Sequence, residues 1–140
     1  MKNQLSLITL SACALLFSSA LPAQPDSKVI VNVPFDFTVM NEQFAAGAYT
    51  VTTNLTQSTI VIRGEDQRPM TALTFAASPS KGDDRAKLIF HRYGDRYILS
   101  QVWDGESGRE LLVSKLEREL AKNNEHPKVV ALVASQRKHQ

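Results

Sequence analysis

KLIFHRYGDRYILSQVW, residues 87–103, is the stretch that decides the fold class, because it predicts a β-hairpin. Two runs rich in β-branched and aromatic residues flank Gly94-Asp95, a pair that is typical of a two-residue hairpin turn. Counting outward from this turn gives the expected cross-strand pairs: Tyr93 with Arg96, Arg92 with Tyr97, His91 with Ile98, Phe90 with Leu99 and Ile89 with Ser100. Apolar residues fall on both faces of the hairpin, which favours strands in the middle of a sheet.

The same counting predicts which side chains share a face of the hairpin. One face should carry an aromatic and aliphatic set: Phe90, Tyr97, Leu99 and Trp103. The opposite face should carry a purely aliphatic set: Ile89, Ile98 and Val102. Because successive residues of a strand point to opposite faces, this division depends on an unbroken register.

Alternation of apolar and polar residues predicts further strands on both sides of the hairpin. The ranges are 29–39, 48–55, 59–63 and 69–77 before it and 129–134 after it. Pro34 interrupts the first range, which implies an edge position, a bulge or two short strands. Leu73 and Phe75 are expected to point inward. The apolar run VVALVA at 129–134 is expected to form a buried final strand, followed by a polar tail.

One amphipathic helix is expected near the C-terminus, at residues 114–123. Leucines recur at every fourth position just before and within this range, at Leu112, Leu116 and Leu120. Ser114 and Glu117 have the spacing of a capping box, and the leucine stripe should face the core. The fold class expected is therefore mainly β (α+β): an antiparallel β-sandwich or open barrel of about seven strands, with this one short C-terminal helix.

The first 23 residues have the layout of a secretory signal peptide. A lysine at position 2 precedes an apolar run at 5–17 and small residues that fit cleavage after Ala20 or Ala23. Residues 24–140 then form one β-rich domain, exported to the periplasm or outside the cell, with no transmembrane segment. Cys13 ends a lipobox-like sequence, LSAC, but the apolar run continues beyond it, which disfavours a lipid anchor.

Four segments together resemble a family of short, exported, uncharacterised proteins common in acidobacteria. They are VNVPFDFTV at 31–39, AGAYTV at 46–51, the hairpin at 87–103 and GRELLVSKLERELAK at 108–122. The chain departs from the family pattern at residues 44–46, where the family often has a proline before Ala-Gly. The resemblance implies a bacterial origin and an export route, and it brings no catalytic or binding residues with it.

Charge and residue pattern limit the classes of function. Removal of Lys2 from the sixteen Lys and Arg leaves fifteen against fourteen Asp and Glu, so the mature domain is nearly neutral and no nucleic-acid partner is expected. His91, His126 and His139 are too scattered for a zinc site, so no metal is expected. His91 could act as a base with Asp95 or Asp104 beside it, but no recognisable nucleophile motif accompanies it.

The residues best suited to recognition form an aromatic and cationic cluster: Arg92, Tyr93, Arg96, Tyr97 and Trp103. The structural alternative is that Tyr97 and Trp103 fill the core while the arginines cap the hairpin. We expect a non-enzymatic exported domain, without a cofactor, that binds an unknown protein, glycan or small ligand or serves a structural role in the envelope. Two alternatives stay open: a small-molecule carrier barrel, which needs an internal cavity, and a small hydrolase using His91.

Overall fold

The computed structural model describes residues 26–79, 82–123 and 126–139, and the predicted signal peptide with Cys13 lies outside these ranges. Within them the chain forms one helix, α1 (Lys115–Lys122), and eleven strands. The strands are β1 (Ser27–Val33), β2 (Phe37–Val39), β3 (Glu42–Phe44), β4 (Gly47–Asn54), β5 (Thr59–Gly64), β6 (Met70–Ala76), β7 (Lys87–Tyr93), β8 (Arg96–Trp103), β9 (Gly108–Leu111), β10 (Lys128–Val133) and β11 (Gln136–His139).

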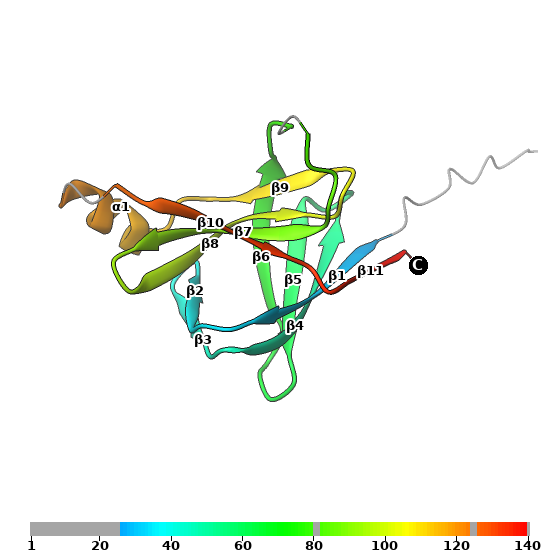
Figure 1. Ribbon diagram of the computed structural model, residues 1–140, viewed down its shortest axis with the longest axis horizontal. Helices are drawn as coiled ribbons and strands as arrows, with labels where there is room; N and C mark the ends of the chain where they lie inside the picture. The colour runs from blue at the N-terminus through cyan, green and yellow to red at the C-terminus, as the bar shows by residue number, and fades with distance from the viewer. Residues whose placement is uncertain (1–25, 80–81, 124–125, 140) are drawn as a thin grey trace, which may run out of the picture.

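The strands belong to one curled, open sheet with the order β10-β7-β8-β9-β6-β5-β4-β1-β11 (Figure 1). The β2–β3 hairpin joins it through a parallel contact of β2 with β8. The two end strands of this order are consecutive in the chain. Ala134 N–H donates to the Ala86 carbonyl (2.8 Å) and Ser135 N–H to the Ile30 carbonyl (2.9 Å), so the last segment passes from one sheet edge to the other. The predicted fold class, mainly β with one helix, is confirmed, and the sheet is open.

The expected number of strands is too low, because several strands are short or polar. Pro34 separates β1 from β2, which is the two-strand outcome that the proline allowed. β3 and β9 lie outside the predicted strand ranges, because three or four residues carry no readable alternation. β11 occupies the expected polar tail, where backbone pairing with β1 determines the structure.

The β7–β8 hairpin has the predicted register from the turn as far as Phe90 and Leu99. Gly94 has the expected positive φ, 58°. Beyond that point a β-bulge shifts the pairing, so that Ile89 lies opposite Gln101 rather than Ser100. The extra residue exchanges the faces of the remaining strand. Val102 therefore joins Phe90 in the core cluster, and the expectation that Trp103 shares that face is wrong.

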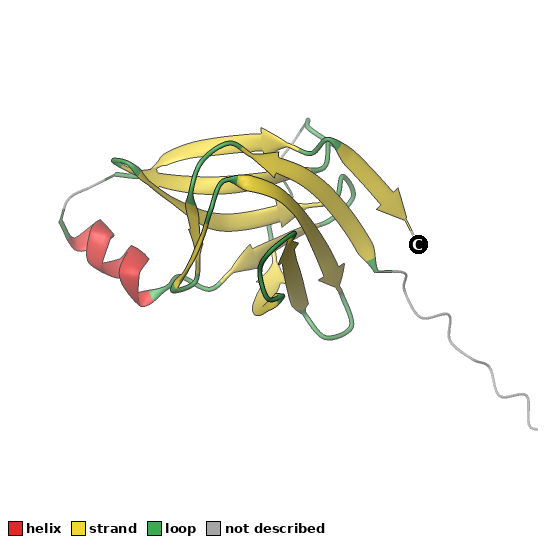
Figure 2. Ribbon diagram, turned by 90° about the horizontal axis from the view of Figure 1, so that it is seen from below, coloured by secondary structure: helices red, strands yellow, loops and turns green. Residues whose placement is uncertain are grey.

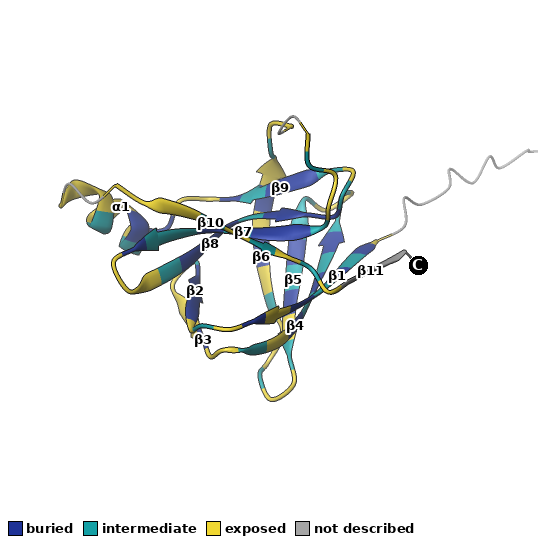
Figure 3. Cartoon of the chain, in the orientation of Figure 1, coloured by how far each residue is buried: buried dark blue, intermediate teal, exposed yellow. Residues whose placement is uncertain are grey.

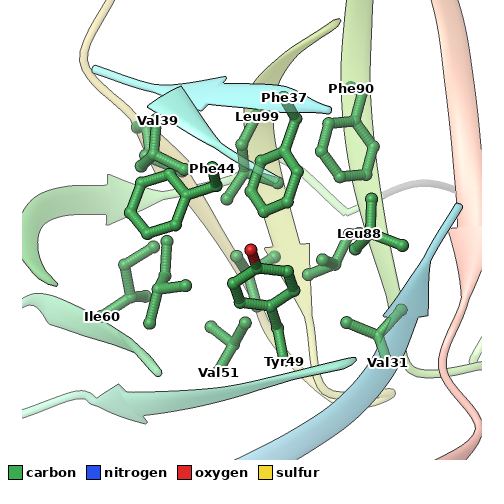
Figure 4. Packing of buried hydrophobic residues seen from close by; sticks show 14 of the residues in the cluster. Val31, Phe37, Val39, Phe44, Tyr49, Val51, Ile60, Leu88, Phe90 and Leu99 are labelled. Atoms are coloured by element: carbon green, nitrogen blue, oxygen red, sulfur yellow. The ribbon is translucent and has the colours of Figure 1, made fainter. Parts of the chain in front are cut away.

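The core fills the space enclosed by the curled sheet. The rings of Phe37, Phe44, Tyr49 and Phe90 converge there with aliphatic side chains from the surrounding strands (Figure 4). Phe37 contacts all three other rings, with centroids 5.0–5.5 Å apart. Edge-to-face and offset packing of this kind adds to the free energy gained from burial. The centre of the fold is thus occupied by the protein's own side chains.

Two expectations about strand faces are wrong. Leu73 and Phe75 of β6 are 63% and 45% exposed, whereas Ala72 and Thr74 point inward. Thr74 is buried because its hydroxyl and carbonyl accept hydrogen bonds from the guanidinium of Arg109, at 3.0 Å each. β10 is also only half-buried, since alternate residues along it are exposed (Figure 3). A run of apolar residues alone does not indicate which face is buried.

Asp104 holds the turn between β8 and β9. Its Oδ1 accepts hydrogen bonds from the backbone N–H groups of Glu106 and Ser107, both at 2.8 Å. Burial on its own would raise the pKa of this carboxyl, but the N–H groups of Ser107 and Glu106 outweigh burial and lower it. The ionised form is therefore favoured by folding.

We expect Asp104→Ala to lower the free energy of unfolding by about 1–2 kcal/mol, because two partly buried N–H groups lose their acceptor. A carboxyl whose pKa is lower in the folded than in the unfolded state stabilises the fold at pH values above its unfolded-state pKa. This stabilisation is lost as the pH falls through the folded-state pKa. In urea unfolding at neutral pH, the wild type should therefore have a higher free energy of unfolding than Asp104→Asn. This difference should shrink as the pH is lowered. A difference that stays constant between neutral and acidic pH would contradict this assignment.

Candidate functional site

A surface cleft of about 390 Å3 opens where the β2–β3 hairpin meets the tip of the β7–β8 hairpin. We call it the hairpin cleft. Its lining combines polar and aromatic side chains: Asp36, Phe37, Thr38, Gln43, Phe44, Ala45, Gln67, Asp95, Arg96 and Tyr97. Its volume falls within the range of about 300–1,000 Å3 that is typical of small-ligand sites.

The walls of the hairpin cleft are fixed by backbone contacts of the β2–β3 segment. Thr38 pairs with Ile98, which places β2 beside β8. Asp36 Oδ1 accepts a hydrogen bond from the Ala46 N–H at 2.9 Å. The Tyr49 hydroxyl donates to the Ala45 carbonyl at 2.5 Å, and burial, followed by the charge of Asp36, raises the pKa of Tyr49. Both ends of this segment are therefore anchored, and the cleft has defined walls.

The predicted recognition cluster divides between different parts of the structure. Arg96 and Tyr97 line the hairpin cleft. Tyr97 stacks on Phe35, with centroids 3.7 Å apart and planes inclined by 14°. The guanidinium carbon of Arg92 lies 5.4 Å from the centroid of Tyr97, and Arg92 Nε donates to the Gly94 carbonyl. These contacts hold the Tyr97 ring in one orientation at the edge of the cleft.

The other two members of the cluster lie away from the cleft. Tyr93 is buried on the face of the hairpin opposite to Tyr97, and its hydroxyl bonds to Glu117 on helix α1. Trp103 is buried at the far end of β8, where its Nε1 donates to Gln101 Oε1 at 2.9 Å. The Nζ of Lys87 lies 5.8 Å from the centroid of the Trp103 ring. Of the structural alternative, Trp103 is buried and Arg92 bonds to the hairpin turn at Gly94. Tyr97 packs partly against the core cluster, but it also lines the cleft together with Arg96.

Sequence reasoning missed four polar residues that line the hairpin cleft: Asp36, Thr38, Gln43 and Gln67. Asp36 carried a signal, since it occupies a polar position between two phenylalanines in the VPFDF segment. Gln43 and Gln67 lie outside the predicted strands. Neither position has a local pattern that predicts its approach to residues 95–97, because that contact depends on the curl of the sheet.

His91 has a different partner from the ones expected. Its Nδ1 lies 2.6 Å from Glu117 Oε1 on helix α1, and neither Asp95 nor Asp104 is its partner. The Tyr93 hydroxyl donates to the same oxygen at 3.1 Å. Glu117 is buried although the helix lies at one end of the sheet (Figure 2). We call these three residues the helix clasp.

The capping box is formed only in part. The Ser114 hydroxyl accepts a hydrogen bond from the Glu117 N–H at 3.1 Å, as predicted. The Glu117 carboxylate, however, points to His91 and Tyr93 in the clasp. The expected packing of the leucine stripe on the core is wrong: Leu112 is exposed, Leu116 and Leu120 are only partly buried, and none of the three belongs to the core cluster. The helix is attached chiefly through a polar group.

The helix clasp contains a histidine and a carboxylate at the distance of a base and its orienting group. Burial, followed by the charge and hydrogen bond of Glu117, raises the pKa of Tyr93 to about 12, so its hydroxyl remains a donor at neutral pH. His91 is not among the residues that line the hairpin cleft. A ligand seated in that cleft would therefore not contact His91, and the arrangement serves to hold the helix.

Three further findings bear on the kind of protein. Among the described residues, no group of three or more His, Cys, Asp and Glu side chains could hold a metal ion. In the same part of the chain, no helix is long and apolar enough to cross a membrane. Comparison with protein-family models, curated proteins and solved structures gives no match for this chain. The function is therefore inferred from the geometry of the hairpin cleft.

Proposed function

We propose that this chain is an exported, non-enzymatic domain that binds a ligand in the hairpin cleft. The observation that carries the proposal is the cleft itself, which is lined by the polar residues Gln43, Gln67 and Arg96 and by Tyr97, whose ring is stacked on Phe35. The signal-peptide pattern of residues 1–23 and the resemblance to exported bacterial proteins support export.

The contacts of the core and of the helix clasp favour this function over the two alternatives. A carrier barrel needs an internal cavity, whereas the rings of Phe37, Phe44 and Phe90 fill the centre of the sheet. A hydrolase using His91 needs a substrate beside that side chain, and His91 is paired with Glu117 outside the hairpin cleft. A surface site on a rigid scaffold fits both observations.

The test is to produce the complete chain in a Gram-negative bacterium and isolate it from the periplasm. The mass of the denatured protein should correspond to a chain that begins at Leu21 or Gln24. Under native conditions the protein should carry additional non-covalent mass. Arg96→Ala should lose this mass, because Arg96 lies in the cleft, whereas Arg118→Ala should retain it.

Arg118 is a matched control, since it is an exposed arginine on α1 and does not line the hairpin cleft. A chain that retains Met1 and stays in the cytoplasm would contradict export. Native mass equal to the bare protein for the wild type, or equal loss of bound material in both arginine variants, would contradict a binding site in the cleft.

A further inference from the structure

A second cleft adjoins the hairpin cleft. This cleft of about 220 Å3, which we call the loop cleft, shares Ala45 and Gln67 with it. The remaining lining of the loop cleft is Ala46, Gly47, Ala48, Tyr49, Gly64, Glu65 and Asp66. We call the two adjoining clefts together the groove. Two neighbouring clefts suit a chain molecule, because successive units of one chain can occupy both.

The polar groups along the groove include both hydrogen-bond donors and acceptors. Arg96 is a donor at one end, and Gln43 and Gln67 offer both a carbonyl and an amide along its length. Acceptors are supplied by carboxylates at both ends: Asp36, Asp95, Glu65 and Asp66. Donors and acceptors placed side by side match hydroxyl groups, because each hydroxyl both donates and accepts.

Most of these side chains are not used within the protein. Asp36 contributes one oxygen to the Ala46 N–H. The side chains of Gln43, Gln67 and Arg96 form no hydrogen bond or ion pair with other described residues. By contrast, Glu117 Oε1 is bonded to both His91 and Tyr93, and both oxygens of Asp104 accept hydrogen bonds. The groove therefore keeps its hydrogen-bonding groups available to a ligand in place of water.

We infer that the groove binds a neutral, hydroxyl-rich chain, namely a segment of an uncharged glycan. This inference rests on the proposed function and specifies its ligand. The Tyr97 ring, held by Phe35, forms a rigid edge at which one sugar unit is positioned, and the glutamines and Arg96 bind the hydroxyls of neighbouring units. The open groove admits a chain that extends beyond both ends.

The charges in the groove disfavour an acidic ligand. An acidic chain would meet carboxylates at both ends, namely Asp36, Asp95, Glu65 and Asp66, and like charges in a partly desolvated site repel each other. A cationic chain would be attracted by these carboxylates, but its ammonium groups accept no hydrogen bond from Arg96 or from the glutamine amides. A neutral polyhydroxyl chain avoids the repulsion, and its hydroxyls can satisfy both the carboxylates and the guanidinium.

The experiment is a titration of the isotope-labelled mature domain, followed by backbone amide chemical shifts. The probes are neutral pentasaccharides (cellopentaose, maltopentaose and N-acetylated chitopentaose), an acidic pentagalacturonate and a cationic deacetylated chitopentaose. At least one neutral probe should shift the amides of Gln43, Ala45, Gln67 and Arg96. Arg96→Ala should weaken that binding about tenfold, the effect expected from losing one charge-assisted hydrogen bond. Arg118→Ala should leave it unchanged.

The outcomes separate the inference from the function on which it rests. Shifts of the groove amides by a charged probe alone would overturn the neutral-glycan assignment and leave the cleft as a binding site. Shifts confined to amides outside the groove would overturn the assignment of the site. If no probe shifts the groove amides, but the periplasmic protein carries non-covalent mass that Arg96→Ala removes, only the assignment of the ligand as a glycan is overturned. No shift and no such mass would overturn both.

Discussion

Replacement of Glu117 by alanine is expected to lower the free energy of unfolding by about 3 kcal/mol. The substitution removes the acceptor of the buried Tyr93 hydroxyl and the partner of His91 Nδ1. It leaves a buried donor without an acceptor, which costs more than the net value of the hydrogen bond itself. Urea unfolding of the wild type and the variant measures this difference from the shift in midpoint at constant slope.

The matched control is Glu119→Ala, which removes an exposed carboxylate from the same helix. It should change stability by no more than about 0.5 kcal/mol. Glu117→Gln should fall between the two, because its carbonyl oxygen still accepts one hydrogen bond. Equal stability losses for Glu117→Ala and Glu119→Ala would mean that the clasp does not hold the helix.

Gly108→Ala is expected to destabilise the protein by about 2–3 kcal/mol, because the new methyl group has no space. A Cβ at residue 108 would lie 2.5 Å from two ring carbons of Trp103. Trp103 cannot move away freely, since it is buried and its indole N–H is bonded to Gln101. Trp103 is the single tryptophan of the chain, so its fluorescence reports the displacement directly.

Gly47→Ala provides the comparison, because the nearest side-chain atom to its added Cβ is 4.0 Å away. We expect it to change stability by no more than about 1 kcal/mol and to leave the fluorescence spectrum as in the wild type. An unchanged Trp103 spectrum and midpoint in Gly108→Ala would show that the ring does not lie against residue 108.

The sequence was sufficient to predict elements whose pattern is local. The hairpin followed from Gly94-Asp95 and the runs beside it, and the helix range agrees with α1 to one residue at each end. Features that depend on pairing between strands far apart in the sequence were not predicted. The bulge at Ile89/Phe90 is an example, since β8 pairs with both β7 and β9. No residue near the bulge indicates its position in the sequence.

The site was predictable only in part, for the same physical reason. Arg96 and Tyr97 were named because they stand in a strong local motif, and they line the cleft. Gln67 reaches the cleft from a loop that lies far from them in sequence. Glu117 was recognised as a capping residue, but its side chain bonds to His91, 26 positions away, a contact that helix periodicity cannot indicate.

The central claim is that the hairpin cleft binds a ligand and that no chemistry at His91 acts on it. Its most direct test is a native mass spectrum, recorded over time, of the domain with the neutral pentasaccharide that gives the largest shifts. The intact pentasaccharide should remain bound to the wild type and to His91→Gln, which keeps a donor for Glu117, and should be lost from Arg96→Ala. Retention by Arg96→Ala, or shortened products with the wild type but not with His91→Gln, would contradict the claim.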